Sequence, residues 1–313
     1  MARAGRMQMV AAWLWLLVAS VASLELAADM WIRGAVPTDD SWDAASTFVH
    51  TRFKANDRIV AAPSWADPVV RLYAGDLLSL RAAAPSDSAG FDRVWELSIR
   101  GASTRDTAPD LEAQLGRVRV RMWPVSTDDV RYDFVQQVAH ANVELIHGDA
   151  PRPCPWLEAP TGPGGLGRGP MAPERRFVCD AGRPWLWVGS TVLADLTLTP
   201  RRCIWQHPVG SDPVRVTFED VPLADRLVVH GGIDYENERW RAGSPVILRV
   251  WISDRLVGEL VHHDGDGWSE LEIQTGKLGF DRATVRFETV TEDPKARLFC
   301  WSASTRAAGT SDE

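Results

Sequence analysis

The hydrophobic residues near the start of the chain form one continuous run. Residues 10–24 (VAAWLWLLVASVASL) carry no charge, Arg3 and Arg6 precede them, and Glu25 ends the run. A basic stretch followed by an apolar stretch is the order of an export signal. We therefore interpret residues 1–30 as either a cleaved signal peptide or a single uncleaved membrane anchor.

The charge on the N-terminal side of this run predicts where the rest of the chain lies. Basic residues remain in the cytoplasm, so both interpretations place the remainder outside it, in the periplasm or at the cell surface. An uncleaved segment predicts attachment to the inner membrane. A buried core helix that happens to be N-terminal is the remaining alternative.

Helical and strand patterns alternate over residues 35–125. Apolar positions recur at helical spacing in residues 41–54, whereas residues 57–63 and 91–99 are apolar runs with strand character. We interpret residues 110–115 as a short helix. This alternation predicts a small α/β domain with a parallel sheet.

The remainder of the chain, residues 126–306, is dominated by a period of two. The change to this period begins at 117–123, near the end of the first domain, and strict alternation recurs at 214–218, 227–230, 246–252, 271–274 and 283–288. Turn residues separate the later strands, which is typical of an antiparallel β-sandwich or jelly roll. The fold class is therefore an α+β two-domain protein, with a small α/β domain followed by this sandwich.

Two segments do not fit either pattern. Residues 151–173 (PRPCPWLEAPTGPGGLGRGPMAP) are rich in Pro and Gly, which predicts a long exposed loop within the sandwich. Residues 307–313 are small and polar, which predicts a disordered tail.

Composition excludes some classes of partner. The net charge is −8, with 42 acidic against 34 basic residues, and the chain has no basic run. Nucleic-acid binding needs a concentrated cationic surface, so we expect no nucleic-acid partner. We also expect no cofactor, because no phosphate-binding loop, nucleophile elbow or HExxH motif is present.

The four cysteines agree with an oxidising compartment. None has CxxC spacing or a histidine at a metal-ligand interval, so an even number predicts disulfides. Of three pairings we favour Cys154 with Cys179, closing an irregular loop, and Cys203 with Cys300, joining early and late strands. Free buried thiols are the alternative.

A series of short motifs in the first domain resembles a known family. They are WDAA at 42–45, DRIV at 57–60, PSW at 63–65, YAG at 73–75 and DRVW at 92–95. Together they resemble the extracytoplasmic region that follows the last membrane helix of bacterial protein mannosyltransferase-like (family 39) glycosyltransferases. In those enzymes the acidic catalytic residues lie on the first extracytoplasmic loop of a membrane domain with many helices. This chain has at most one membrane segment. The resemblance implies an accessory domain without its enzyme, so no catalytic residue is carried over.

A second resemblance lies in the later half. Residues 266–275 (DGWSELEIQT) and 283–288 (ATVRFE) resemble the late hairpin of galactose-binding-like jelly rolls. This resemblance implies the fold more than sugar binding, because many sandwiches share such a core hairpin.

The cluster HHDGDG at residues 262–267 offers candidate metal ligands. Calcium prefers oxygen ligands on a flexible loop, and Asp264 and Asp266 supply them, although the EF-hand spacing is absent. The alternative is an Asp-Gly turn between two strands, which is common for steric reasons.

A second polar cluster predicts a sugar site. Asp234, Tyr235, Glu236, Arg239 and Trp240 follow two glycines on one predicted loop. Sugar sites combine polar groups for hydroxyls with an aromatic face for the C–H surface of the ring. The alternative is a solvated loop in which Arg239 pairs with an acid and Trp240 covers the core.

Tryptophan, with 15 residues, is the unusual feature of the composition. Five lie in apolar strand patterns and are predicted core residues: Trp185, Trp187, Trp205, Trp251 and Trp301. Trp156, Trp240 and Trp268 lie beside turns and are candidate stacking surfaces, and Trp268 joins the predicted ligand site.

These observations favour a non-catalytic binding or accessory protein of the cell envelope, either glycan-binding or associated with glycosylation. Its predicted partners are a glycan or an envelope protein, and the membrane if the N-terminal segment is uncleaved. Two alternatives remain: an envelope glycan hydrolase with paired carboxylates, and a structural protein-interaction module.

Overall fold

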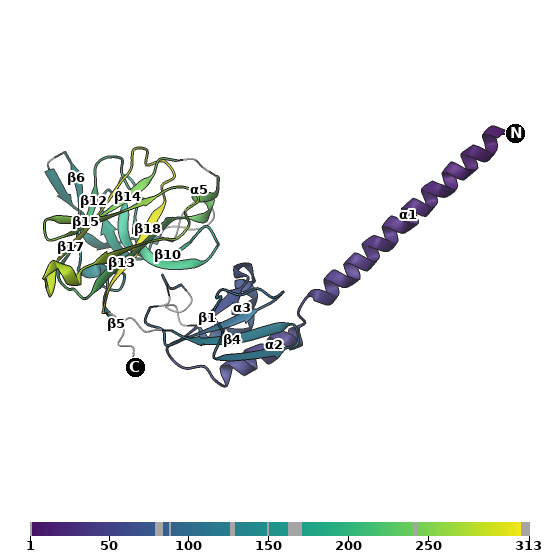
Figure 1. Cartoon of the computed structure of the whole chain (residues 1–313). Coiled ribbons are helices and arrows are strands. Elements are labelled where there is room, and N and C mark those ends of the chain that lie inside the picture. Colours follow the sequence, from purple (N-terminus) through teal and green to yellow (C-terminus); the bar gives the residue numbers. More distant parts are fainter. Residues whose placement is uncertain are drawn as a thin grey trace.

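The computed structural model describes residues 2–78, 84–87, 89–125, 129–148, 150–161, 171–240 and 243–307 (Figure 1). The helices are α1 (Ala2–Ala35), α2 (Asp39–His50), α3 (Asp67–Ala74) and α5 (Tyr235–Trp240), with short 3₁₀ turns η1 (Ser64–Ala66), η2 (Gly75–Leu77), η3 (Val138–His140) and η4 (Gly276–Leu278). The predicted tail lies almost entirely outside these residues.

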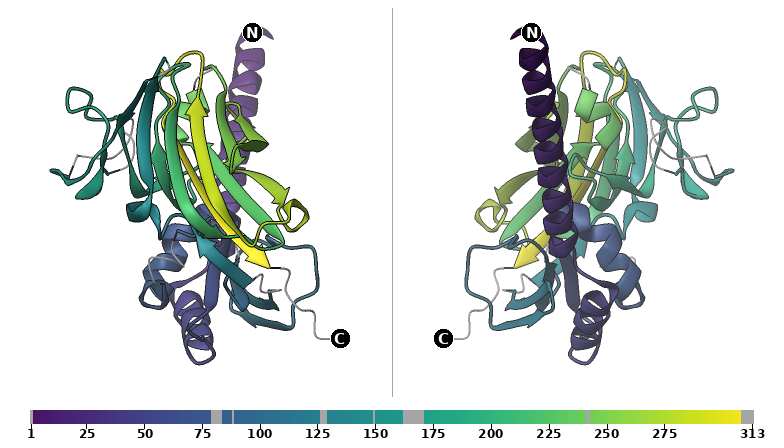
Figure 2. Two further views of the ribbon diagram at one scale, coloured as in Figure 1. Left: turned by 90° about the vertical axis from the view of Figure 1, so that its left-hand side faces the viewer. Right: turned by 90° about the vertical axis from the view of Figure 1, so that its right-hand side faces the viewer.

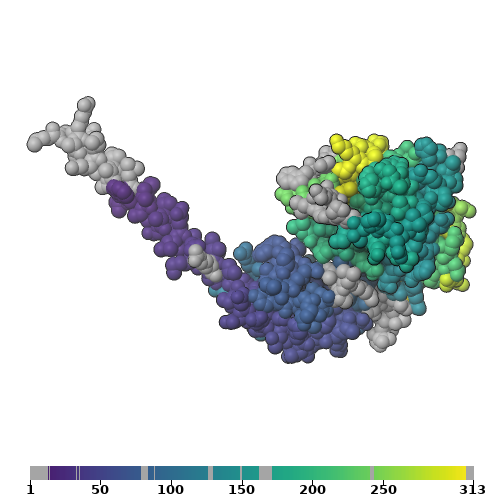
Figure 3. All heavy atoms as spheres, turned by 180° about the vertical axis from the view of Figure 1, so that it is seen from behind, coloured from purple at the N-terminus to yellow at the C-terminus, as the bar shows by residue number. Residues whose placement is uncertain are grey.

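Helix α1 stands apart from the rest of the molecule (Figures 1 and 3). Within it, Trp15–Ile32 is 18 residues long with a mean hydropathy of 1.5, and none of it is buried. Among the described residues, α1 is the one helix long and apolar enough to cross a membrane. Its apolar surface extends past Glu25, where the sequence pattern placed the end of the run.

The small domain is built on a four-stranded sheet in the order β1-β2-β4-β3. Its strands are β1 (Asp57–Ala62), β2 (Arg93–Ser98), β3 (Leu111–Leu115) and β4 (Val118–Pro124). Helices α2 and α3 pack on one face, where Trp42, Val70 and Trp95 share a core. Because β1–β2 is parallel and the other pairs are antiparallel, the predicted parallel sheet is corrected to a mixed sheet.

The predicted short helix at residues 110–115 is wrong. Leu111–Leu115 is strand β3, and it pairs antiparallel with β4 across a tight turn at Gly116, whose φ is 58°. Its alternating side chains, with Leu111, Ala113 and Leu115 half-buried, follow a period of two that the sequence analysis missed.

The larger domain is a sandwich of two antiparallel sheets, which confirms the predicted β-sandwich. One sheet contains β16 (Ser269–Gln274), β13 (Arg226–Ile233), β18 (Phe299–Ala307), β11 (Pro200–Gln206), β10 (Trp187–Ala194), β9 (Arg175–Val178) and β8 (Trp156–Glu158) in that order, and β5 (Asp129–Asp133) also pairs with β18. The other contains β15 (Arg255–His262), β14 (Val246–Ile252), β17 (Arg282–Val290), β12 (Val214–Pro222), β6 (Asn142–His147) and β7 (Ala150–Pro153).

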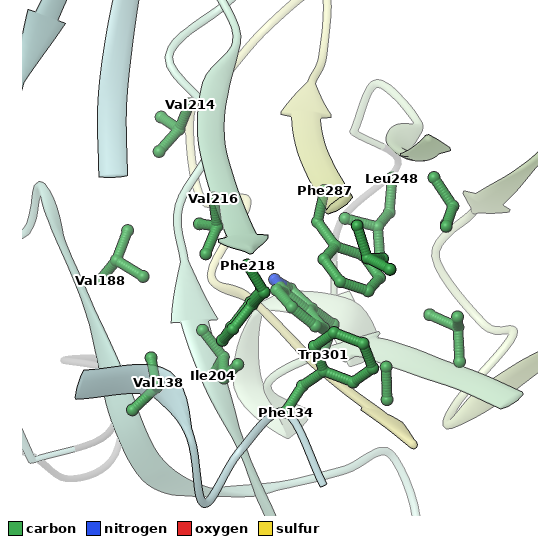
Figure 4. Packing of buried hydrophobic residues seen from close by; sticks show 14 of the residues in the cluster. Phe134, Val138, Val188, Ile204, Val214, Val216, Phe218, Leu248, Phe287 and Trp301 are labelled. Carbon is green, nitrogen blue, oxygen red and sulfur yellow. The ribbon is translucent and has the colours of Figure 1, made fainter. Parts of the chain in front are cut away.

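Trp301 lies at the centre of the sandwich core (Figure 4). Its ring stacks on Phe287 with centroids 4.1 Å apart, and its Nε1 donates to Gln206 Oε1 at 2.7 Å. Gln206 in turn donates to the Val214 carbonyl at 2.8 Å. The largest core side chain therefore has its single polar atom satisfied, as burial of an indole requires.

Two disulfides join Cys154 to Cys179 and Cys203 to Cys300, which is the pairing that the sequence favoured. The first links the ends of β7 and β9, and the second links the adjacent strands β11 and β18. The predicted loop at 151–173 is corrected in part, because β7 extends into it and β8 lies within it. Edge strands tolerate such prolines, and residues 162–170 lie outside the described part of the chain.

Residues 84–87 bring the small domain into contact with the sandwich. The Arg202 amide donates to the Ala84 carbonyl at 2.7 Å, and Asp87 pairs with Arg306 at 2.5 Å. Burial acts to raise the pKa of Asp87, but the charges of Arg306 and His230 outweigh it and hold that pKa below its usual range. The two parts retain separate hydrophobic cores, and the exact domain boundaries stay a prediction.

The two disulfides are expected to differ in their contribution to stability. They close loops of 97 and 25 residues, for which chain entropy gives about 4.7 and about 3.5 kcal/mol. Replacing Cys203 and Cys300 together by Ala should therefore lower the free energy of unfolding more than replacing Cys154 and Cys179. Denaturant titration of both double variants measures this, and the opposite order would contradict the prediction.

Candidate functional site

The predicted ligand residues on 234–240 do not form an open loop. All but Asp234 lie on helix α5, and Asp234 directly precedes it; Asp234 is buried, and its Oδ1 accepts from Asn237 Nδ2 at 2.6 Å. Burial raises the pKa of Asp234 despite this hydrogen bond. Arg239 donates to the Tyr235 hydroxyl and lies 5.1 Å from its ring. Glu236 is half-buried, and the side chain of Trp240 lies outside the described residues.

The two predicted metal ligands are occupied by protein groups. Asp264 accepts from Arg297 Nη1 at 2.7 Å and from the Gly243 amide at 2.7 Å, while Asp266 accepts from the His263 amide at 2.8 Å. Within the described ranges, no group of three or more His, Cys, Asp or Glu side chains is arranged to hold a metal ion. Residues 262–267 therefore contain the Asp-Gly turn between two strands that was the alternative to a metal site.

Trp268 is half-buried and packs against neighbouring side chains. Its ring stacks on His230 with centroids 6.4 Å apart, and the Arg201 Cζ lies 5.8 Å from it. A side chain at Gly232 would lie 2.9 Å from the Gly267 carbonyl and 3.0 Å from the Trp268 ring, so glycine is required there. Trp268 and the α5 residues lie at neighbouring positions, but none of them lines the two cavities described next.

The first cavity, of about 90 Å³, lies where residues 84–91 meet the sandwich. His230 lines it and contacts Glu270 at 2.9 Å and Asp87 at 3.6 Å. Ser302 also lines it, and its buried Oγ has no hydrogen-bond partner among the described residues. The space suits a few water molecules rather than a sugar ring.

The second cavity is an open groove of about 510 Å³ at the β6–β7 end of the sandwich. Its polar lining is His147, Arg152, Arg183 and Asp212, over the apolar side chains of Leu145 and Val209. We name it the Trp185 groove after an adjacent side chain: Trp185 does not line the cavity itself, but the Cζ of the lining residue Arg183 lies 5.9 Å from the Trp185 ring. This volume falls in the range of small-molecule sites.

The lining of the Trp185 groove is held by local contacts. Asp180 accepts from Arg183 Nε at 2.8 Å, and Arg152 donates to the Cys179 carbonyl at 2.5 Å, next to the disulfide with Cys154. Across the groove, His147 pairs with Asp212 at 2.7 Å. The Arg183 hydrogen bond and the Gly182 amide lower the pKa of Asp180, so this carboxylate stays charged at neutral pH.

Trp185 is 37% exposed, so its predicted place in the core is wrong. Strand β10 begins only at Trp187, which stacks on Trp205 with centroids 5.3 Å apart, whereas Trp185 lies on the turn before it. The inner face of Trp185 contacts His207, with centroids 4.6 Å apart. Burial lowers the pKa of His207 to about 4, so this imidazole is neutral under the indole.

The groove therefore presents donors, acceptors and an adjacent aromatic face on a fixed support. Arginine and histidine N–H groups donate, carboxylates accept, and an exposed indole stacks on C–H surfaces. Sequence analysis missed these residues because they come from separate segments, each ordinary by itself. A signal was present in the sequence, because Pro184 directly before Trp185 marks a turn rather than the interior of a strand.

Comparison with known proteins gives only distant matches. No family model and no curated protein matches the chain, so the resemblance to family 39 glycosyltransferases finds no support. Among solved structures, the CBM51-2 and INT domains of Clostridium perfringens ZmpB in complex with GlcNAc match with 14% identity over 61% of this chain and 35% of that chain, at a TM-score of 0.30.

Tandem CBM51 modules of the family 98 glycoside hydrolase from Streptococcus pneumoniae match with 11% identity over 61% of this chain and 56% of that chain, at a TM-score of 0.31. The chain spans 35% and 56% of the lengths of these two structures. A secreted serine protease of Vibrio cholerae matches with 11% identity over 61% of this chain and 30% of that chain, at a TM-score of 0.24. Similarity of this degree carries no functional argument.

The histidine under Trp185 makes stability depend on pH. The unfolded His207 titrates near 6.5, and its folded pKa is about 4. Acid therefore protonates the unfolded state first, so stability present above pH 6.5 is lost as the pH falls toward 4, by up to about 3 kcal/mol. His207→Gln should flatten this part of the stability curve. Denaturant titrations from pH 7.5 to 4 measure it, and parallel curves for the two proteins would contradict it.

Proposed function

We propose that this chain is a non-catalytic, extracytoplasmic binding protein of the cell envelope whose sandwich binds a glycan in the Trp185 groove. The observation that carries the proposal is the groove of about 510 Å³, with charged donors and acceptors, beside a tryptophan that is 37% exposed. A pyranose offers hydroxyls to such groups and a C–H face to the indole.

Two features support the location outside the cytoplasm. All four cysteines are paired, and disulfides persist in oxidising compartments. We infer that α1 is a retained anchor rather than a cleaved signal. Helix α1 is continuous over 34 residues, and its 18-residue segment Trp15–Ile32 keeps a mean hydropathy of 1.5 although it contains Glu25 and Asp29, so it is long enough to cross a bilayer.

The alternative of a glycan hydrolase has less support. Asp234 is a carboxyl whose pKa is raised, as a general acid requires, but it is hydrogen-bonded to Asn237 and does not line the groove. Unlike Asp234, the two carboxylates beside the groove form ion pairs: Asp180 pairs with Arg183, and Asp212 pairs with His147. This pairing favours holding a polar ligand over proton transfer.

Glycan binding should depend on the exposed indole. In the full chain in nanodiscs, Trp185→Ala should weaken binding of any glycan found by array screening at least about tenfold, because it removes the stacking surface. Phe280→Ala is the matched control, since Phe280 is an exposed aromatic residue of the sandwich that does not line the groove. Isothermal titration measures both affinities.

Two results would reject the proposal. One is an unchanged affinity for Trp185→Ala, with thermal unfolding showing an intact sandwich. The other is a screen that identifies only protein partners, which would favour the structural interaction module.

A further inference from the structure

The outward face of helix α3 is apolar, which is the reverse of an ordinary surface helix. Val70 and Ala74 face the core, as expected, but the opposite face carries Val69 and Leu72, which are 36% and 77% exposed. Trp65, four residues before Val69, is 58% exposed and extends the same stripe. A solvated helix normally places polar residues there, and an exposed apolar stripe is typical of surfaces that contact a partner or a membrane.

The charged residues of α3 do not interrupt the stripe. Asp67 and Arg71 pair with each other along the side of the helix, and both are only about one-third exposed. Arg100 lies with its Cζ 5.4 Å from the Trp65 ring. The surface therefore has an apolar centre with an arginine beside its tryptophan.

This stripe lies close to the place where α1 ends. Only residues 36–38 separate α1 from α2, and three extended residues span about 10 Å. Asp39, the first residue of α2, accepts a hydrogen bond from the Tyr73 hydroxyl at 2.7 Å, and Tyr73 is the neighbour of Leu72. The C-terminal end of α3 is thus fixed next to the point where the chain leaves α1.

We propose that Trp65, Val69 and Leu72 lie in the interfacial layer of the membrane that α1 crosses, so that α3 rests on the lipid surface. The inference rests on the proposed role of α1 as a retained anchor. Tryptophan favours the headgroup region, arginine extends its charged end toward phosphates, and an apolar helix face enters the acyl boundary.

A lipid surface fits this stripe better than a protein does. A stable protein interface needs roughly 800 Å² on each partner, and three side chains on a short helix supply much less. A bilayer demands no shape complementarity, and the tether through α1 keeps α3 beside it at a high effective concentration. Weak affinity is therefore sufficient for lasting contact.

The test uses one introduced cysteine in the full chain, because all four native cysteines are in disulfides. Leu72→Cys, labelled with an environment-sensitive fluorophore, is reconstituted into nanodiscs that contain lipid-bound quenchers. Leu256→Cys is the matched control, since Leu256 is an exposed leucine, 42% accessible, on β15 of the sandwich. We expect quenching at least about threefold stronger at position 72, as interfacial insertion requires.

The outcomes separate this proposal from glycan binding. Equal quenching at both positions overturns the membrane contact. A label at position 72 that is shielded from an aqueous quencher but is not quenched by the lipid-bound quencher also overturns it, because that result indicates a protein partner. Mass analysis of the exported protein that finds α1 removed overturns it as well. In each case the Trp185 groove is tested separately by its own titration.

Discussion

Strand β18 is the constraint on which the larger domain depends. Its alternation sends Phe299, Trp301 and Ala303 into the sandwich core and Cys300, Ser302 and Arg306 to the opposite face. The inner set requires the acceptor on Gln206, and the outer set forms a disulfide to β11 and an ion pair to the small domain. Figure 2 shows β18, in yellow, running the length of the sandwich with its C-terminal end toward that domain. A one-residue slip would exchange both faces, so one register fixes the core, the disulfide and the domain contact together.

The Trp185 groove lies away from β18, at the edge strands, where the chain is free to vary. Its residues belong to hairpins and turns that the sandwich supports, which is where binding residues usually occur. Such loops lose conformational entropy when they bind, unless they are already held. The disulfide between Cys154 and Cys179 and the contacts of Asp180 provide that restraint, so the indole and the arginines stand in place before a ligand arrives.

Sequence patterns predicted the regular part of the fold and missed the site. The alternation in Val246–Ile252 and Arg282–Val290 marks long buried strands, and both were recognisable because the inward face is apolar throughout the first and, apart from Thr289, in the second. β3 was not, since its alternating face is only half-buried. The acidic residues at the start of α5 gave a misleading signal: the buried Asp234 carboxylate accepts from the Asn237 side chain, and Glu238 accepts from the Gly267 amide. Local composition did not distinguish this structural role from a ligand site. The groove depends on contacts between distant segments, which no local pattern encodes.

The contact between the two domains gives orientation more than stability. Asp87, Arg306 and His230 form a buried or half-buried cluster, and the cost of removing such charges from water offsets much of their attraction. Burial lowers the pKa of His230 even though Asp87 and Glu270 act to raise it, which shows how strongly this environment disfavours charge. What the cluster does supply is a defined geometry, because Asp87 of the small domain pairs with Arg306 and contacts His230 of the sandwich. If α3 rests on the membrane, this geometry holds the sandwich at one orientation to the lipid surface, so that the Trp185 groove faces a constant direction for its ligand.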